Sequence, residues 1–174
     1  MRWTLLGLIG ALGLGGISTL LFQLGPWQTG TVGGALALGP WQTGTFGGTI
    51  AAGTVDEIKD GDVIRYPQGK FWLARYKEPA LGNRSVLLAL YWKCAHLGCT
   101  VPWKPDESFQ GHQGIFHCPC HGSIYTRTGQ NLAGPAGRPL DIIAIRLAGG
   151  QIAVDTGKIT QRVQYDPAQA TPIG

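Results

Sequence analysis

The amino-acid sequence predicts an all-β globular domain preceded by a single N-terminal transmembrane α-helix. Three observations predict this arrangement: an uncharged apolar stretch at the N-terminus, several short apolar runs bounded by glycine and proline in the remainder, and the lack of a long amphipathic helical pattern after the first stretch. Short strands joined by glycine- and proline-containing turns are typical of all-β domains. A length of 174 residues suits one such domain with an appendage.

The first charged residue after Arg2 is Asp56, and the apolar segment Trp3–Leu24 lies between them. A helix over these 22 residues reaches about 33 Å, and the hydrocarbon core of a membrane is about 30 Å thick. We expect residues 1–24 to form a single-pass membrane anchor, because the apolar region of a cleaved signal peptide is shorter, about 7–15 residues. Arg2 ahead of the segment predicts a cytoplasmic N-terminus.

Residues 25–54 contain a local duplication. Gly25–Gly34 returns as Gly39–Gly48 with nine of ten positions identical. The region is rich in glycine, so we expect a tether, which as a flexible chain has a root-mean-square span of about 30 Å. Trp27 and Trp41 offer an alternative, in which they anchor the region at the membrane interface or on a neighbouring subunit and order it.

Residues 55–174 carry the pattern of the globular domain. Val63–Tyr66 and Phe71–Tyr76 flank a Pro-Gln-Gly turn and predict a hairpin. Pro102–Glu107 is expected to be an exposed turn, and the polar tail from Gln161 to Gly174 is left unassigned. Further strands are expected at four apolar runs: Ser85–Trp92, Ile115–Cys118, Ile142–Leu147 and Gln151–Val154.

All four cysteines and two of the four histidines fall in two short segments, Cys94-Ala-His-Leu-Gly-Cys99 and Cys118-Pro-Cys-His-Gly-Ser123. Thiolates and imidazoles are ligands for iron–sulfur clusters and for zinc. A four-coordinate zinc site is one alternative to a cluster. Two disulfides without a metal are another, because four cysteines allow three pairings, but that leaves both histidines unexplained. The net charge of +4 is spread without a basic run, which argues against nucleic acid as a partner.

The two segments resemble those of the Rieske subunit of cytochrome bc-type quinol oxidoreductases, respiratory or photosynthetic. The resemblance is close over residues 85–140. It implies a Rieske fold of stacked antiparallel sheets, with the cluster-binding part at about residues 92–140 and a 2Fe–2S cluster between loops at one tip. The implied ligands are Cys94 and Cys118 on the buried iron, and His96 and His121 on the exposed iron.

The resemblance also assigns residues around the cluster. Cys99 and Cys120 lie beside the ligands, where a disulfide could tie the loops together, and such a bond requires an oxidising compartment. Ser123 and Tyr125 stand at the positions that donate hydrogen bonds to the cluster and raise its potential. Gly134, Pro135 and Ala136 correspond to the loop that covers the cluster. Gly137 departs from the pattern, since the family more often has a second proline there.

The function implied is that of the electron-transfer subunit of a membrane quinol:cytochrome c (or plastocyanin) oxidoreductase, which is not active alone. A cytochrome b-type subunit and a c-type cytochrome subunit are the expected partners, with quinol bound at the interface against His96 or His121. The cluster domain is expected on the periplasmic, luminal or equivalent outer side of the membrane. Two alternatives remain: the Rieske small subunit of an exported molybdenum oxidase such as arsenite oxidase, and a non-redox, disulfide-stapled β interaction domain.

Overall fold

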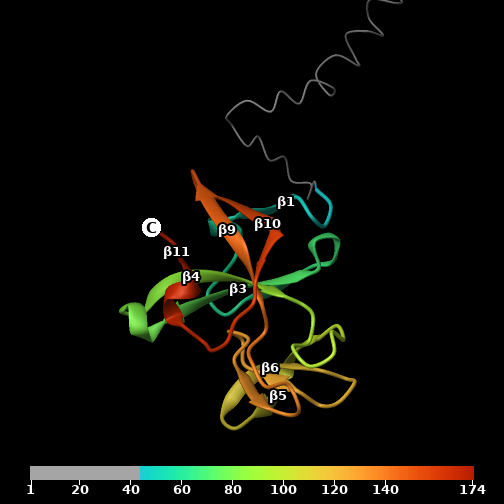
Figure 1. Ribbon diagram of the computed structural model, residues 1–174. Coiled ribbons are helices and arrows are strands. Elements are labelled where there is room, and N and C mark those ends of the chain that lie inside the picture. Colours follow the sequence, from blue (N-terminus) through green and yellow to red (C-terminus); the bar gives the residue numbers. More distant parts are fainter. Residues whose placement is uncertain (1–43) are drawn as a thin grey trace, which may run out of the picture. The chain divides into compact units, whose positions relative to one another are not determined.

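The computed structural model describes residues 44–174, and Figure 1 shows their arrangement. The predicted anchor and most of the expected tether lie outside these residues. The described part contains strands and four short 3-10 helices but no α-helix, so the all-β prediction is confirmed for it. Nothing in this part of the chain forms a helix with the length and apolar character needed to cross a membrane.

A larger antiparallel sheet has the strand order β1-β10-β9-β4-β3-β2, and the short strand β11 pairs with β4 beside this path. The Tyr66 hydroxyl at one edge donates to the carbonyl of Ala52 at the other, with the two oxygens 2.8 Å apart. The sheet therefore curls until its two edge strands approach each other. Its strands are β1 (Thr49–Thr54), β2 (Val63–Tyr66), β3 (Phe71–Glu78), β4 (Arg84–Tyr91), β9 (Ile142–Ala148), β10 (Gln151–Thr160) and β11 (Thr171–Pro172).

A smaller antiparallel sheet has the order β5-β6-β7-β8. In Figure 1 its strands β5 and β6 lie at the opposite end of the domain from β1, β9 and β10. The strands of this sheet are β5 (Trp103–Phe109), β6 (His112–His117), β7 (Ile124–Tyr125) and β8 (Asn131–Ala133). The 3-10 helices lie at the turns of the chain: η1 (Val55–Glu57), η2 (Pro67–Gly69), η3 (Pro79–Leu81) and η4 (Pro167–Gln169).

Strand β4 separates two hydrophobic cores because side chains alternate along it. Val86, Leu88 and Leu90 face a core shared with the smaller sheet. Leu87 and Ala89 face a second core, which the curl of the larger sheet encloses. The predicted run Ser85–Trp92 is therefore confirmed as a strand that is buried on both faces.

Two sequence expectations are wrong. Pro102–Glu107 is not a turn, because β5 begins at Trp103 and pairs with β6. The ring of Trp103 packs on Phe116 with centroids 4.8 Å apart, while the exposed Pro105 lies where the register shifts, as is usual for proline in a strand. Thr49–Thr54 belongs to β1 and not to the tether, because Ile50 and Ala52 are buried in the second core and pull this segment against β10.

Replacement of Leu87 by Ala should lower the free energy of unfolding by about 2–5 kcal/mol, because a fully buried leucine leaves a cavity that its neighbours fill only in part. Leu97→Ala is the matched control: Leu97 is 69% exposed, so its truncation should change the stability by about 0.5 kcal/mol or less. Urea unfolding followed by circular dichroism measures both variants. Equal losses would contradict the assignment of Leu87 to the core.

Candidate metal centre

Two loops with the same backbone geometry face each other at one end of the core that the larger sheet shares with the smaller sheet. The first loop, Cys94–Cys99, lies between β4 and β5, and the second, Cys118–Ser123, joins β6 to β7. In each loop the amide of the first residue donates to the carbonyl of the last, at 2.7 Å and 2.8 Å. The amides of Gly98 and Gly122 each donate back to the carbonyl of the first residue, at 2.9 Å and 3.1 Å. Both glycines have positive φ, +76° and +72°, which side chains disfavour.

The loops place two sulfur atoms in the interior and two imidazoles toward solvent. Cys94 and Cys118 are buried free thiols. His96 is half-buried and His121 is exposed, and their ring centroids lie 5.0 Å apart with the planes nearly perpendicular. The structure thus brings together all four ligands predicted from the sequence.

A disulfide between Cys99 and Cys120 ties the two loops together, as predicted. The sulfur atoms of Cys99, Cys118 and Cys120 lie within 4.8 Å of one another, but the two in the disulfide cannot act as thiolate ligands. The alternative of two disulfides is wrong, because Cys94 and Cys118 are not bonded to each other.

Hydrogen bonds converge on the Cys94 sulfur. The Tyr125 hydroxyl lies 3.1 Å from it and accepts a bond from the amide of Ala95, which leaves the hydroxyl proton free for the sulfur. Burial alone would raise the pKa of the Cys94 thiol, but the bonds from Tyr125 and from the His96 amide outweigh burial and lower this pKa. Burial, reinforced by the neighbouring Cys94, raises the pKa of Tyr125, so its hydroxyl remains a donor.

Burial also raises the pKa of the Cys118 thiol, and the adjacent Cys94 raises it further, although the backbone amides of Cys120 and His121 oppose this shift. Two thiolates side by side repel each other, and a bound cationic metal centre removes that repulsion. Paired buried thiols with amide donors and two outward imidazoles therefore fit a mixed sulfur and nitrogen metal centre.

The third loop packs against the second. The Ala136 amide donates to the Ser123 hydroxyl at 3.2 Å, and Ser123 is fully buried. Gly134 has φ of +88°, and a Cβ atom there would lie 2.5 Å from the Cα atom of Ser123. Pro135, which lies between Gly134 and Ala136, is exposed. The expected covering loop thus contacts the candidate site through backbone atoms.

The other histidines take no part in the two loops. Nδ1 of His117 lies 2.9 Å from a Glu107 carboxylate oxygen on the neighbouring strand. His112 lines a pocket of about 560 Å³ between the ends of β3 and β6, and none of the four predicted ligands lines this pocket. Sequence reasoning missed Trp72, whose indole nitrogen donates to the carbonyl of Val101 at 3.0 Å and fixes the chain just after the first loop.

Gly134→Ala should lower the free energy of unfolding of the domain by about 2 kcal/mol or more. The reason is that the new methyl group would meet backbone atoms of Ser123, and that Gly134 has a positive φ, which a side chain disfavours. Gly137→Ala tests the same substitution in the same loop where nothing lies within 4 Å of the new atom, and it should be tolerated. Thermal unfolding of both variants gives the comparison. Similar melting temperatures for the two variants would contradict the close contact between Gly134 and the backbone of Ser123.

Known proteins similar to this chain include iron–sulfur subunits of cytochrome complexes. The cytochrome b6-f complex iron-sulfur subunit of Chlorobaculum thiosulfatiphilum is 31% identical over 103 residues, which are 58% of this chain and 54% of that protein. The menaquinol:cytochrome c reductase iron-sulfur subunit of Geobacillus thermodenitrificans is 38% identical over 77 residues, 44% of either chain. A cytochrome b6-f subunit of Synechococcus sp. (strain JA-3-3Ab) is 41% identical over 59 residues, 34% of this chain and 31% of its own length. The chain thus spans about a third to a half of these relatives' length.

Among solved structures, a chain of a hyperthermophilic respiratory Complex III is 29% identical, with coverage of 83% of this chain and 96% of that one and a TM-score of 0.43. The profile of the Rieske [2Fe-2S] domain matches residues 49–146, which include both cysteine-containing loops. The predicted cofactor, a 2Fe–2S cluster of the Rieske type, agrees with this match. Since the profile covers more than half of its length, the chain belongs to the Rieske [2Fe-2S] domain family.

Proposed function

We propose that this chain is the Rieske electron-transfer subunit of a membrane quinol:cytochrome c (or plastocyanin) oxidoreductase, which accepts one electron from quinol and passes it to a c-type haem or a copper protein. The observation that carries the proposal is the pair of buried thiols beneath two adjacent imidazoles that reach solvent. An electron carrier needs an interior that holds its cofactor and one face through which partners approach. The two loops supply both.

The four predicted ligands divide by burial. Cys94 and Cys118, which are buried, would hold the inner iron, and His96 and His121, which are less buried, would hold the outer one. The bound cluster supplies a one-electron redox change, at potentials of about −150 to +300 mV in the Rieske class, because two neutral imidazoles replace two anionic thiolates. His121 is the more exposed imidazole, so its ring is the more accessible to the hydroxyl group of a quinol.

The proposed partners are a cytochrome b-type subunit and a c-type cytochrome subunit, because relatives of the chain are named as subunits of cytochrome b6-f and menaquinol:cytochrome c reductase complexes. Quinol oxidation would need the cytochrome b-type subunit, so this chain would act as the redox subunit of an enzyme and not alone. The disulfide between Cys99 and Cys120 supports a cluster domain on the outer side of the membrane, where disulfides persist. Residues 1–24 would anchor it there with the N-terminus in the cytoplasm.

Ser123→Ala and Tyr125→Phe should each lower the midpoint potential of the centre by about 20–60 mV. The reason is that a hydrogen bond of about 1 kcal/mol favours the more negative reduced state, and 59 mV corresponds to about 1.4 kcal/mol for one electron. Tyr125 lies 3.1 Å from the Cys94 sulfur, and Ser123 accepts from Ala136 in a way that frees its own proton for the site. Redox titration followed by electron paramagnetic resonance measures the shift.

Tyr66→Phe is the matched control for these variants. It removes another buried tyrosine hydroxyl, but this hydroxyl bonds the Ala52 carbonyl in the second core. Its potential should equal that of the wild type. A potential unchanged in Ser123→Ala and Tyr125→Phe would remove both side chains from the proposed set of donors.

Affinity purification of the full chain from its native membrane tests the assignment to a complex. We expect iron and acid-labile sulfide in equal amounts, together with a b-type and a c-type cytochrome. A molybdopterin subunit in their place would assign the chain to a molybdenum oxidase. A colourless protein with zinc alone, or with no metal, would overturn the redox function.

A further inference from the structure

Arg162 is the largest of the fully buried side chains in the described part of the chain, with 1% of its surface exposed. It lies in the tail after β10, between the exposed residues Gln161 and Val163. The arginine side chain thus enters the interior between two exposed neighbours. The matched family region ends at residue 146, so this residue comes from beyond it.

The Arg162 side chain joins two segments that flank the metal centre. Its Nε donates to the carbonyl of Leu140 at 2.6 Å, and one terminal nitrogen donates to the carbonyl of Thr128 at 2.9 Å. Thr128 lies three residues after Tyr125, and Leu140 lies four residues after Ala136. The guanidinium therefore fastens the exit of β7 to the exit of the covering loop.

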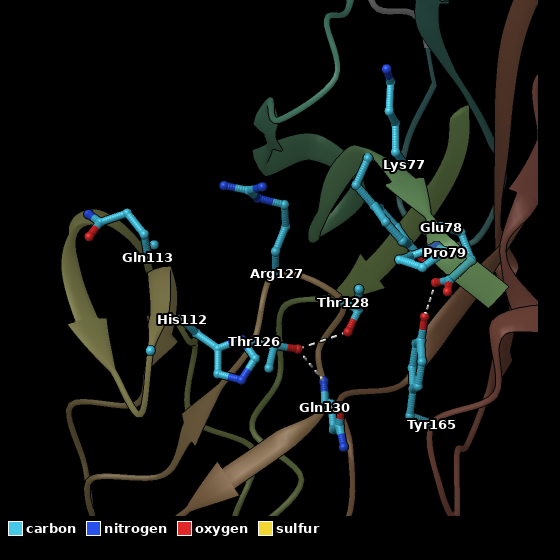
Figure 2. A pocket seen from close by; sticks show the side chains of 13 residues that line it. Lys77, Glu78, Pro79, His112, Gln113, Thr126, Arg127, Thr128, Gln130 and Tyr165 are labelled. Carbon is cyan, nitrogen blue, oxygen red and sulfur yellow. Dashed lines mark hydrogen bonds between the residues drawn. The ribbon is translucent and has the colours of Figure 1, made fainter. Parts of the chain in front are cut away.

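The backbone between these two points is closed around the guanidinium. The amide of Leu140 donates to the carbonyl of Gly129 at 2.9 Å. The amide of Gly129 in turn donates to the carbonyl of Thr126 at 2.9 Å. A Cβ atom at Gly129 would lie 2.5 Å from the terminal nitrogen of Arg162. Figure 2 shows the same turn from the side of the pocket, where the hydroxyl groups of Thr126 and Thr128 lie 2.8 Å apart.

A backbone hydrogen bond and an ion pair link this part of the chain to the covering loop. The backbone amide of Arg162 donates to the Asp141 carboxylate at 3.4 Å, and the Arg138 side chain pairs with both oxygens of the same carboxylate. Arg138 follows Gly137, the position at which the family more often has proline. The carboxylate thus holds the loop at the point where the expected stiffening residue is missing.

The Arg162 charge is retained at a cost. Burial lowers its pKa to about 10, although Tyr76, Tyr165 and Asp141 oppose the shift, so the group remains a cation at neutral pH. An apolar side chain would fill the same space without the penalty of burying a charge. The planar guanidinium offers what an apolar group does not, which is several donors in fixed directions.

We propose that Arg162 is a positioning residue for the metal centre, which locks the covering loop to the turn after Tyr125 and so holds the Ala136 amide on the Ser123 hydroxyl. The inference rests on the proposed site, in which Ser123 donates to the cluster. Arg162 touches no predicted ligand and acts through the loop alone. The alternative is that it only stabilises the fold.

The test uses the cluster-loaded protein with Arg162→Met, Arg162→Lys and the control Arg146→Met, whose parent side chain is exposed and pairs with Asp155 at the surface. Arg162→Met should lower the midpoint potential and speed hydrogen exchange in peptides over residues 134–140 at least tenfold. Arg162→Lys should restore part of the potential and part of the protection from hydrogen exchange, because an ammonium group can still donate to one carbonyl. Arg146→Met should change neither.

A double-mutant cycle separates positioning from general stability. In a Ser123→Ala background, Arg162→Met should leave the potential unchanged, because the group through which it acts is gone. An equal drop in both backgrounds, or faster exchange spread over β3 and β4 as well, would overturn the proposal. If Arg162→Met does not fold, Arg162→Lys carries the same comparison, and a wild-type potential together with wild-type exchange over residues 134–140 in that variant would overturn the proposal.

The outcome also separates this inference from the proposed function. If Ser123→Ala alone leaves the potential unchanged, the hydrogen-bonding role of Ser123 fails, and the inference about Arg162 fails with it as regards the potential. If Ser123→Ala lowers the potential but Arg162→Met moves neither the potential nor the loop exchange, only the role of Arg162 is wrong.

Discussion

The constraint on which the structure depends is the placement of two thiol groups side by side away from water. As thiolates they repel each other, and the repulsion grows as the surroundings become less polar. Around Cys94 and Cys118 the fold supplies backbone amides and the Tyr125 hydroxyl, whose donors favour negative charge on sulfur. The disulfide then prevents the two loops from moving apart. A site with these features is prepared for a cationic cofactor before the cofactor arrives.

The rest of the fold gives this site a rigid base. The side chains of β4 that point toward the smaller sheet belong to the same core as Cys94 and Cys118. The opposite face of β4 is buried as well, so the strand cannot shift without disturbing both cores. The loops that hold the sulfur atoms therefore extend from the least mobile kind of element, while the imidazoles at their tips remain open to partners.

Much of the fold and of the site could be predicted from the sequence, because strands and ligand motifs leave local patterns. The hairpin at Val63–Tyr76 and the loops at Cys94 and Cys118 are examples. Pro102–Glu107 was predicted wrongly because proline and charge indicate a turn, whereas pairing with β6 makes it a strand. The burial of Arg162 leaves no local signal, because an arginine in a polar tail has the pattern of a solvated residue and only tertiary contacts reveal its place.

The hydrogen bond between Tyr66 and Ala52 has a consequence for contacts between copies of the domain. A sheet with free borders offers unpaired amides and carbonyls to its neighbours, and identical chains can add to one another through them. Here the two edge strands of the larger sheet, β1 and β2, approach each other, and the Tyr66 hydroxyl occupies one of the edge carbonyls, that of Ala52. Copies of the domain are thereby discouraged from adding to one another through the edges of the larger sheet.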